Sequence, residues 1–310
     1  MSAERQRGER ATGIALRDPL PWHDLEQVVE TADQTGYSSL FLPEIAARDV
    51  FAALTTLAPA APNLTLATGV ATILSRTQRI TAMGAATVAE RSGGRMLLGL
   101  GTGPARNGAL DALRSYVTAV RILLDGGELD GERLTLDIPR PVPIWIAALG
   151  PRAMRLAGEV ADGVLLNWCP PERVAFARER IREGAEAAAR DPAGVRVGVY
   201  VRSVVGQGAA GDIGLRRAAA EYASYPAYRR QFDDVGLGAE AERAAAGDVP
   251  DSLLDAVALR GDAATAARRL QSYRDAGADL PVVYPVATLE PVSSILGTLF
   301  ALAPAPAVAD

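Results

Sequence analysis

The sequence is poor in the residue types that build many common catalytic centres. It contains no lysine, so a Schiff base, a Walker-type phosphate-binding lysine and a lysine general base are excluded. Cys169 is the only cysteine and His23 the only histidine. This excludes an intrachain disulfide and cysteine or histidine-rich metal centres, and it disfavours a Ser-His-Asp triad. We interpret Cys169 as a buried apolar filler and His23 as a solvent-exposed residue at the start of a helix.

Long apolar runs and clusters of positive charge are also absent. The first residues, MSAERQRGER, lack the apolar core of a signal peptide, and no run is long enough to span a membrane. The net charge is -5, and acidic and basic residues are interspersed, which disfavours a polyanionic partner. These features predict a cytoplasmic protein whose partner is a small-molecule substrate, with no nucleic acid and no membrane.

What the chain does have is enough apolar material for a large core. Of its 310 residues, 49% are hydrophobic, which allows one large α/β barrel or two smaller domains. Eight apolar runs are predicted as strands: 12–16, 38–42, 64–70, 96–100, 143–148, 163–167, 195–205 and 281–286. Helical patterns alternate with them at 24–35, 50–61, 78–91, 109–124, 152–161, 172–189 and 262–276.

This alternation predicts an α/β fold, and a count of eight strands favours a closed (β/α)8 TIM barrel over an open doubly wound sheet. We predict a single domain over residues 1–310, with flexible ends at 1–11 and 303–310. Residues 206–260 fit no simple strand–helix unit and hold helical patches and several glycines. Residues 126–137 are predicted as a small excursion with a turn at Asp130-Gly131.

The most informative stretch covers residues 64–103, in which two apolar strands flank one helix. The first strand ends at Gly69-Val70, and the second runs into Gly101-Thr102-Gly103. Strands that are apolar on both faces belong to parallel sheets covered by helices. Their carboxyl ends meet at the edge where such enzymes bind ligands. We therefore expect a ligand site at these two turns.

A second candidate turn is Gly150-Pro151-Arg152, which begins a helix directly after strand five. Free backbone N–H groups and the positive end of the helix dipole make such a turn an anion site, and proline suits the first helical position. A plain Gly-Pro helix start is the simpler alternative.

Four motifs in this order, GYSSLFLPE, ATGVATILSRT, AERSGGRMLLGLGTG and PIWIAALGPRAMRLAGEVADGVLLN, closely resemble the bacterial luciferase-like superfamily. More narrowly, they are similar to its coenzyme F420-dependent oxidoreductases. The resemblance extends from Thr12 to Val286. It implies a TIM barrel with the cofactor across the carboxyl ends of the strands, a helical insertion after strand seven, and often a homodimer.

The resemblance also implies roles for individual residues. The bond between Gly69 and Val70 would be a non-prolyl cis peptide against the central ring of the cofactor, and the turn at Gly150 would hold the cofactor phosphate. The implied cofactor-binding residues are Gly69, Val70, Gly101, Thr102, Gly103, Asn107, Ala148, Leu149, Gly150, Pro151, Arg152 and Asn167. Glu44 is the candidate catalytic residue, or else it caps the following loop. Asp162, at the opposite rim, is interpreted as structural.

Departures from the family pattern shape the expected function. Pro104 stands where similar enzymes often carry a glutamate, and Ile45 stands where sugar-phosphate dehydrogenases carry a histidine. Thr102 stands where FMN-using relatives often place an arginine, which favours F420 over FMN. The resemblance implies hydride transfer between C5 of the deazaflavin and an organic substrate. The alternatives are an FMN-dependent monooxygenase of the same superfamily and a non-catalytic barrel that binds a flavin-type cofactor.

Overall fold

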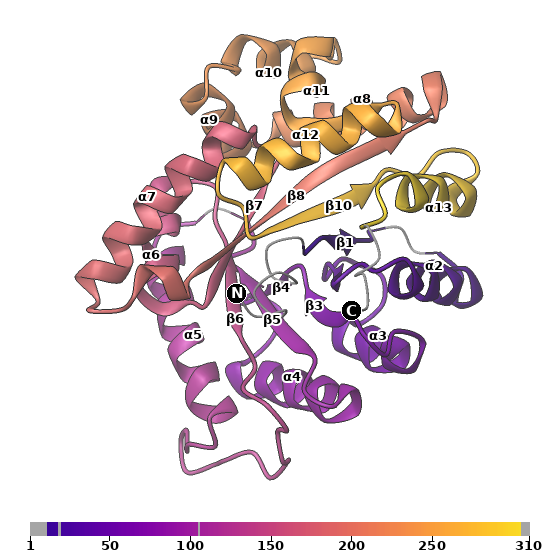
Figure 1. The fold of residues 1–310 in the computed structure, drawn as a ribbon. Helices are drawn as coiled ribbons and strands as arrows, with labels where there is room; N and C mark the ends of the chain where they lie inside the picture. The colour runs from indigo at the N-terminus through magenta and orange to yellow at the C-terminus, as the bar shows by residue number, and fades with distance from the viewer. Residues whose placement is uncertain (1–10, 18–19, 105, 305–310) are drawn as a thin grey trace. The chain divides into compact units, whose positions relative to one another are not determined.

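The computed structural model describes residues 11–17, 20–104 and 106–304 (Figure 1). Its internal contacts group the chain into two compact units. Unit 1 comprises Met1–Tyr37, Leu166–Glu179 and Val197–Asp310, and unit 2 comprises Ser38–Leu165 and Arg180–Arg196. Each unit contains parallel strands with helices packed against them.

The sheet of unit 2 is parallel throughout. Its strands pair in the order β2 (Ser39–Leu42), β3 (Thr65–Thr68), β5 (Met96–Gly101), β6 (Ile144–Ala147) and β7 (Gly163–Asn167). The last two residues of β7 belong to unit 1. A two-residue strand, β4 (Ala71–Thr72), continues the pairing with β5 beyond the end of β3. Every residue of β5 is buried, as expected for a parallel strand covered on both faces.

Helices cover this sheet in sequence order. Neighbouring contacts join α3 (Val50–Leu57) to α4 (Gln78–Ser92), α4 to α5 (Ala109–Leu124), and α5 to α6 (Pro151–Val160). Side-chain caps begin two of them, because Asp49 accepts from the backbone N–H of Ala52 and Thr77 from that of Ile80. Short 3-10 turns, η1 (Ala58–Ala60) and η2 (Pro192–Gly194), and the long helix α7 (Pro171–Ala187) complete the connections.

Unit 1 contains a second set of parallel strands. β10 (Leu280–Pro285) pairs with β1 (Gly13–Ala15) and with β8 (Arg196–Val205), and β8 also pairs with β9 (Ala258–Gly261). Helix α12 (Ala263–Asp275) packs on β9 and β10, while α2 (Trp22–Gln34) and α13 (Pro291–Ala301) lie side by side (Figure 1). The register places Arg202 of β8 opposite Tyr284 of β10.

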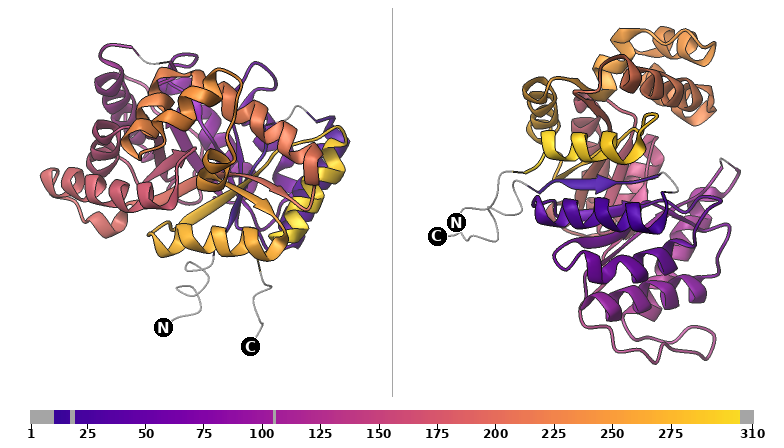
Figure 2. Two further views of the ribbon diagram at one scale, coloured as in Figure 1. Left: turned by 90° about the horizontal axis from the view of Figure 1, so that it is seen from above. Right: turned by 90° about the vertical axis from the view of Figure 1, so that its right-hand side faces the viewer.

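The insertion after β8 is helical, as predicted. It consists of α8 (Gly208–Ser224), α9 (Pro226–Asp234), α10 (Gly238–Ala245) and α11 (Asp251–Val257), which gather together (Figure 2). These helices share a core of buried side chains that includes Leu215, Phe232, Leu253 and Leu254. Trp168, which follows β7, is part of the same core.

The strands β1, β2, β3, β5, β6, β7, β8 and β10, each followed by helical structure, form the predicted (β/α)8 TIM-barrel fold. The predicted turn at Asp130-Gly131 is confirmed, because both residues have positive φ and a bridge joins Leu129 to Glu132. The structure adds β4, β9 and α13, where no element was predicted. The expectations for residues 1–10 and 305–310 lie outside the described part of the chain, and the single-domain boundary stays a prediction.

Candidate functional site

Glu44 lies directly after β2 at the centre of a charged network in unit 2. Its carboxylate accepts hydrogen bonds from the backbone N–H of Thr72 (3.0 Å), from the hydroxyl of Ser75 (3.0 Å) and from Nε of Arg76. The side chains of Glu44 and Arg76 are only 13% and 14% exposed. Its own N–H donates to the carbonyl of Val70 at 3.2 Å. Glu44 therefore ties the segment after β3 to the end of β2.

Arg76 extends this network to a second carboxylate. Besides Glu44, its guanidinium pairs with Asp49, the N-cap of α3. Burial opposes ionisation of Asp49, but hydrogen bonds from Ala52 and Arg76 outweigh it and hold the pKa of this carboxyl below its usual value. Both carboxylates thus share one cation. The role of Glu44 as a catalytic acid or base stays a prediction.

The turn after β3 has the predicted geometry. The peptide bond between Gly69 and Val70 is cis, which confirms the expectation. The hydroxyl of Thr68 donates to the carbonyl of Gly99 (2.7 Å) and accepts from its N–H (2.8 Å). This side chain bonds directly to the backbone of β5 just before the turn. The position of the turn is therefore set by contacts with the neighbouring strand.

Strand β5 lies so close to this turn that two of its positions require glycine. A Cβ atom at Gly99 would lie 2.1 Å from the carbonyl oxygen of Thr68, and one at Gly101 would lie 2.7 Å from Cγ2 of Val70. Real Cβ contacts are not this short, so a side chain at either position would displace the turn. Two of the glycines in the motif LLGLGTG, Gly99 and Gly101, thus allow β5 to lie close to the turn after β3. Gly99 was not among the predicted site residues.

Beyond Gly101, the chain turns outward at the carboxyl end of β5. The hydroxyl of Thr102 donates to the carbonyl of Gly103 at 3.1 Å, and Gly103 has a φ of +66°. Gly103 and Asn107 are exposed, while Thr102 is half-buried. Thr102 carries no charge, so this position offers an anion only a hydroxyl and backbone groups.

The turn between β6 and α6 has the geometry expected of an anion-binding helix start. Gly150 is the N-cap and Pro151 the first residue of α6, and no side chain caps the helix. The first bond within the helix runs from the N–H of Met154 to the carbonyl of Gly150, so the N–H groups of Arg152 and Ala153 are not used by the helix. A Cβ at Gly150 would meet no protein atom within 4 Å. Ala148 is buried, and Leu149 is half-buried.

Asn167 ends β7, and the described residues of unit 1 already engage it. Its Nδ2 donates to the hydroxyl of Tyr228 (2.8 Å), and its Oδ1 accepts from Arg202 (3.2 Å). Its backbone carbonyl accepts from Gln231 at 2.9 Å. These bonds connect the end of β7 to α9 and β8. The predicted cofactor contact of Asn167 stays a prediction.

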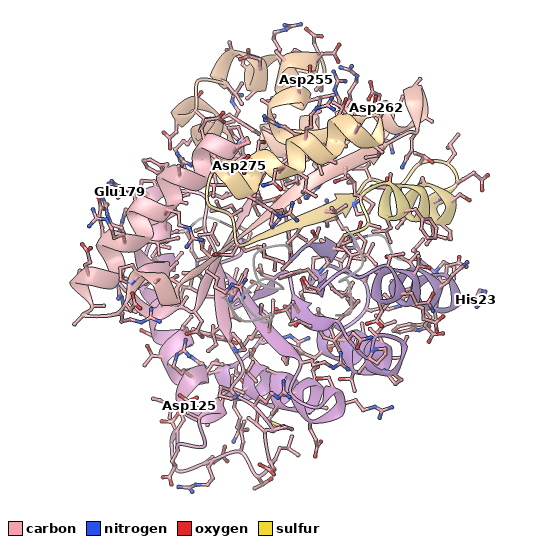
Figure 3. The ribbon with its side chains drawn as sticks, in the orientation of Figure 1. His23, Asp125, Glu179, Asp255, Asp262 and Asp275 are labelled. Atoms are coloured by element: carbon pink, nitrogen blue, oxygen red, sulfur yellow. The ribbon has the colours of Figure 1, made fainter. Side chains whose placement is uncertain are left out.

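Three residues for which the sequence predicted no role in the site have the expected positions. His23 is exposed at the start of α2 (Figure 3). Cys169 is buried, and burial raises the pKa of its thiol to about 12, so it is not a nucleophile. Asp162 accepts from the N–H of Ile144 (2.8 Å) and pairs with Arg121 (3.0 Å), a structural role at the amino end of β6.

Every helix among the described residues is too short or too polar to span a membrane. No group of three or more histidine, cysteine, aspartate or glutamate side chains in the described ranges is arranged to hold a metal ion.

The fold and the arrangement of turns define a class of α/β barrel proteins, and comparison with known proteins specifies it. The family model described as "Luciferase-like monooxygenase" matches residues 2–280. The chain belongs to this family.

Two relatives of the chain are 5,10-methylenetetrahydromethanopterin reductases. A 5,10-methylenetetrahydromethanopterin reductase of Methanolobus tindarius is 32% identical over 213 residues, which are 61% of this chain and 63% of that protein. The corresponding reductase of Archaeoglobus fulgidus is 31% identical over 57% of this chain and 59% of its own length. The alignments thus span about three fifths of these relatives.

Solved structures share the fold at lower identity. The coenzyme F420-dependent tetrahydromethanopterin reductase from Methanopyrus kandleri has a TM-score of 0.75 at 21% identity, covering 94% of this chain and 97% of that one. An F420-dependent secondary alcohol dehydrogenase in complex with an F420-acetone adduct has a TM-score of 0.72 at 16% identity, covering 94% and 99%. These likenesses support the fold.

Proposed function

We propose that the protein is an F420-dependent oxidoreductase that transfers a hydride between C5 of the deazaflavin and an organic substrate. The observation that carries the proposal is the pairing, in unit 2, of a turn pressed against β5 with an anion-ready helix start after β6. The strands β5 and β6 are hydrogen-bonded neighbours, and both features follow their carboxyl ends. Similarity to an F420-dependent reductase and an F420-dependent dehydrogenase supports the same choice.

The residues of unit 2 fit a planar ring with a phosphate-bearing tail. The N–H groups of Arg152 and Ala153 would donate to a phosphate at the positive end of α6, and the exposed Arg152 side chain adds charge. Val70 would pack against the ring, while Gly101, Thr102 and Gly103 would offer backbone rather than side chains. When bound, the deazaflavin supplies the hydride chemistry at its C5. Glu44, through Thr72, Ser75 and Arg76, holds the segment that follows Val70.

The choice between F420 and FMN rests on Thr102. A guanidinium can bind a phosphate with two parallel hydrogen bonds, whereas Thr102 uses its hydroxyl on the carbonyl of Gly103. We therefore expect F420 to bind at least tenfold more tightly than FMN, a difference of about 1.4 kcal/mol or more. Titration of the purified cofactor-free protein with each compound, followed by absorbance and calorimetry, tests this expectation.

The outcomes of this titration separate the alternatives. Tight FMN binding without F420 binding would overturn the proposal in favour of a flavin-dependent monooxygenase, the activity in the family description. F420 binding with no reduction of the bound cofactor by any substrate class would instead indicate a non-catalytic binding barrel. Pro104 at the position of the usual glutamate is the feature that keeps this second alternative open.

The proposal includes a homodimer. It follows from the family resemblance, and two exposed apolar side chains on α4, Ile80 and Met83 (47% and 46% exposed), are the surface that we assign to the interface. Light scattering coupled to gel filtration tests this part, since a single-chain mass at micromolar concentration would refute it.

A further inference from the structure

The most unusual charge in unit 1 is Arg202, which lies within the apolar strand β8. It is 4% exposed, and its strand neighbours Val201 and Ser203 are not exposed at all. Arginine is almost never buried to this degree unless it is paired, because desolvating a cation costs several kcal/mol. The groups that surround its guanidinium therefore indicate the role of Arg202.

Those groups are neutral. NH1 of Arg202 donates to Oδ1 of Asn167 at 3.2 Å, and NH2 donates to the hydroxyl of Tyr222 at 3.3 Å. The first bond is at the long end of the normal range, and the second lies just beyond it. Among the described residues, no carboxylate lies within ion-pairing distance of this guanidinium. The equally buried Arg173, at 2% exposure, pairs instead with Asp234 at 3.1 Å.

Aromatic rings form the rest of the surroundings. The guanidinium carbon lies 3.6 Å from the ring centre of Tyr284, 5.1 Å from that of Trp168 and 5.3 Å from that of Tyr222. Ring faces attract a cation, but they do not neutralise its charge. The rings come from β10, from the residue after β7 and from α8, so three separate segments surround this one side chain.

The cluster is held in place before any ligand arrives. Asn167, which accepts from Arg202, donates in turn to Tyr228 at 2.8 Å, and Tyr228 contacts the ring of Tyr222 edge-on. Of the five N–H donors of a guanidinium, the described residues accept from two. Asn167 and Tyr222 are only half-buried, so part of the cluster is exposed to solvent.

A second cation lies at the outer side of the same cluster. Arg17, which follows β1, pairs with Glu221 of α8 at 3.6 Å, and Glu221 directly precedes Tyr222. Two arginines and one carboxylate therefore surround these tyrosines, which leaves an excess of one positive charge. An anion with a flat apolar body matches both the charge and the rings.

We propose that Arg202, within the box formed by Trp168, Tyr222 and Tyr284, binds the carboxylate of an organic substrate whose carboxylate is attached to a planar, aromatic-like group. The proposal rests on the proposed oxidoreductase function for the identity of this ligand as substrate. A carboxylate matches the planar fork of arginine, and the three N–H groups not used by described residues are the donors. Asn167 is a positioning residue, because it fixes the guanidinium.

Benzoate is a direct probe, with benzamide as its uncharged isostere. Both are titrated into the purified cofactor-free protein while tryptophan fluorescence is recorded, because Trp168 lies beside Arg202. We expect saturable binding of benzoate at least tenfold tighter than that of benzamide. Equal affinities, or no benzoate binding at millimolar concentrations, would overturn the proposal without any variant being needed.

Variants then assign the effect to Arg202. R202M, which keeps much of the side-chain volume, is expected to lose at least tenfold in benzoate affinity, and R202K to lose less because it keeps the charge but not the fork. R173M is the control, since it removes an equally buried arginine that has its own carboxylate partner; its benzoate affinity is expected to match the wild type. A folded R202M protein that binds benzoate normally would refute the assignment.

A parallel F420 titration keeps the two proposals apart. Normal F420 binding without benzoate binding refutes only the role of Arg202. Benzoate binding without F420 binding refutes the proposed function, while leaving the anion site in place.

Discussion

The network around Glu44 allows a quantitative test of what this residue does. Replacing Glu44 by alanine removes one partner of an ion pair whose side chains are 13% and 14% exposed. Breaking a buried pair costs about 3–5 kcal/mol, because the remaining charge is left uncompensated. Arg76 keeps Asp49 as a partner, so we expect a smaller loss in the free energy of unfolding, about 2–3 kcal/mol.

Two further variants divide this loss between charge and hydrogen bonding. E44Q keeps one acceptor oxygen but no charge, so we expect a loss of about 1–2 kcal/mol, near the cost of a hydrogen bond to a charged group. S75A removes only the hydroxyl that donates to Glu44, which corresponds to about 1 kcal/mol. Urea unfolding of the cofactor-free proteins, followed by circular dichroism, measures all three.

Each of the two roles of Glu44, as an anchor and as a catalytic residue, has its own refuting result. An E44A protein within 0.5 kcal/mol of the wild type, about the size of a neutral surface change, would show that Glu44 does not anchor the segment after Val70. The turnover rate tests the catalytic role, since general acids and bases contribute roughly 10²–10⁴-fold in rate. E44Q with full turnover would rule out proton transfer by Glu44, whatever its effect on stability.

Two more predictions concern Gly150 and Asp49, which also belong to unit 2. G150V is expected to weaken F420 binding at least tenfold while leaving the unfolding temperature unchanged, because a Cβ there meets no protein atom; a folded variant with wild-type affinity in calorimetry would count against the phosphate site at α6. The pKa of Asp49 is lower in the folded protein than its usual value. The ionised carboxylate therefore stabilises the fold at pH values above the unfolded pKa of about 3.9, and this stabilisation is lost as the pH falls through the folded pKa. D49N, which can still cap α3, is therefore expected to lose stability relative to the wild type at neutral pH, with the difference shrinking in acid; a constant difference between pH 7 and pH 3 in urea unfolding would contradict this.

Local pattern was sufficient where an element has its own periodic signal. Helix α5 (Ala109–Leu124) and strand β7 (Gly163–Asn167) have the predicted bounds, because apolar spacing and flanking turn residues both mark their ends. The glycine turn after β3 and the helix start at Gly150 were also predicted from the local residues, whereas the cis bond between Gly69 and Val70 was implied by the family resemblance. Strand β4 has only two residues, and β9 owes its strand geometry to pairing with β8, so neither carries a signal of its own.

Helix α13 (Pro291–Ala301) was missed although its signal was present. Pro291 at the first position and the buried residues Ser294, Ile295, Thr298 and Leu299 follow helical spacing. In the structure this helix packs against α2 and β10.

The residue types available for chemistry were determined by the sequence alone: no lysine, one cysteine, one histidine, and glycines where two strands end. Which charges meet was decided only by the tertiary structure. Arg76 lies 32 residues from Glu44 and 27 from Asp49 along the chain, and the partners of Arg202 come from β7, α8 and β10. Sequence spacing carries no information about such pairs, because ion pairing and ring contacts act over a few ångströms in space, and only the folded chain brings these side chains within that distance.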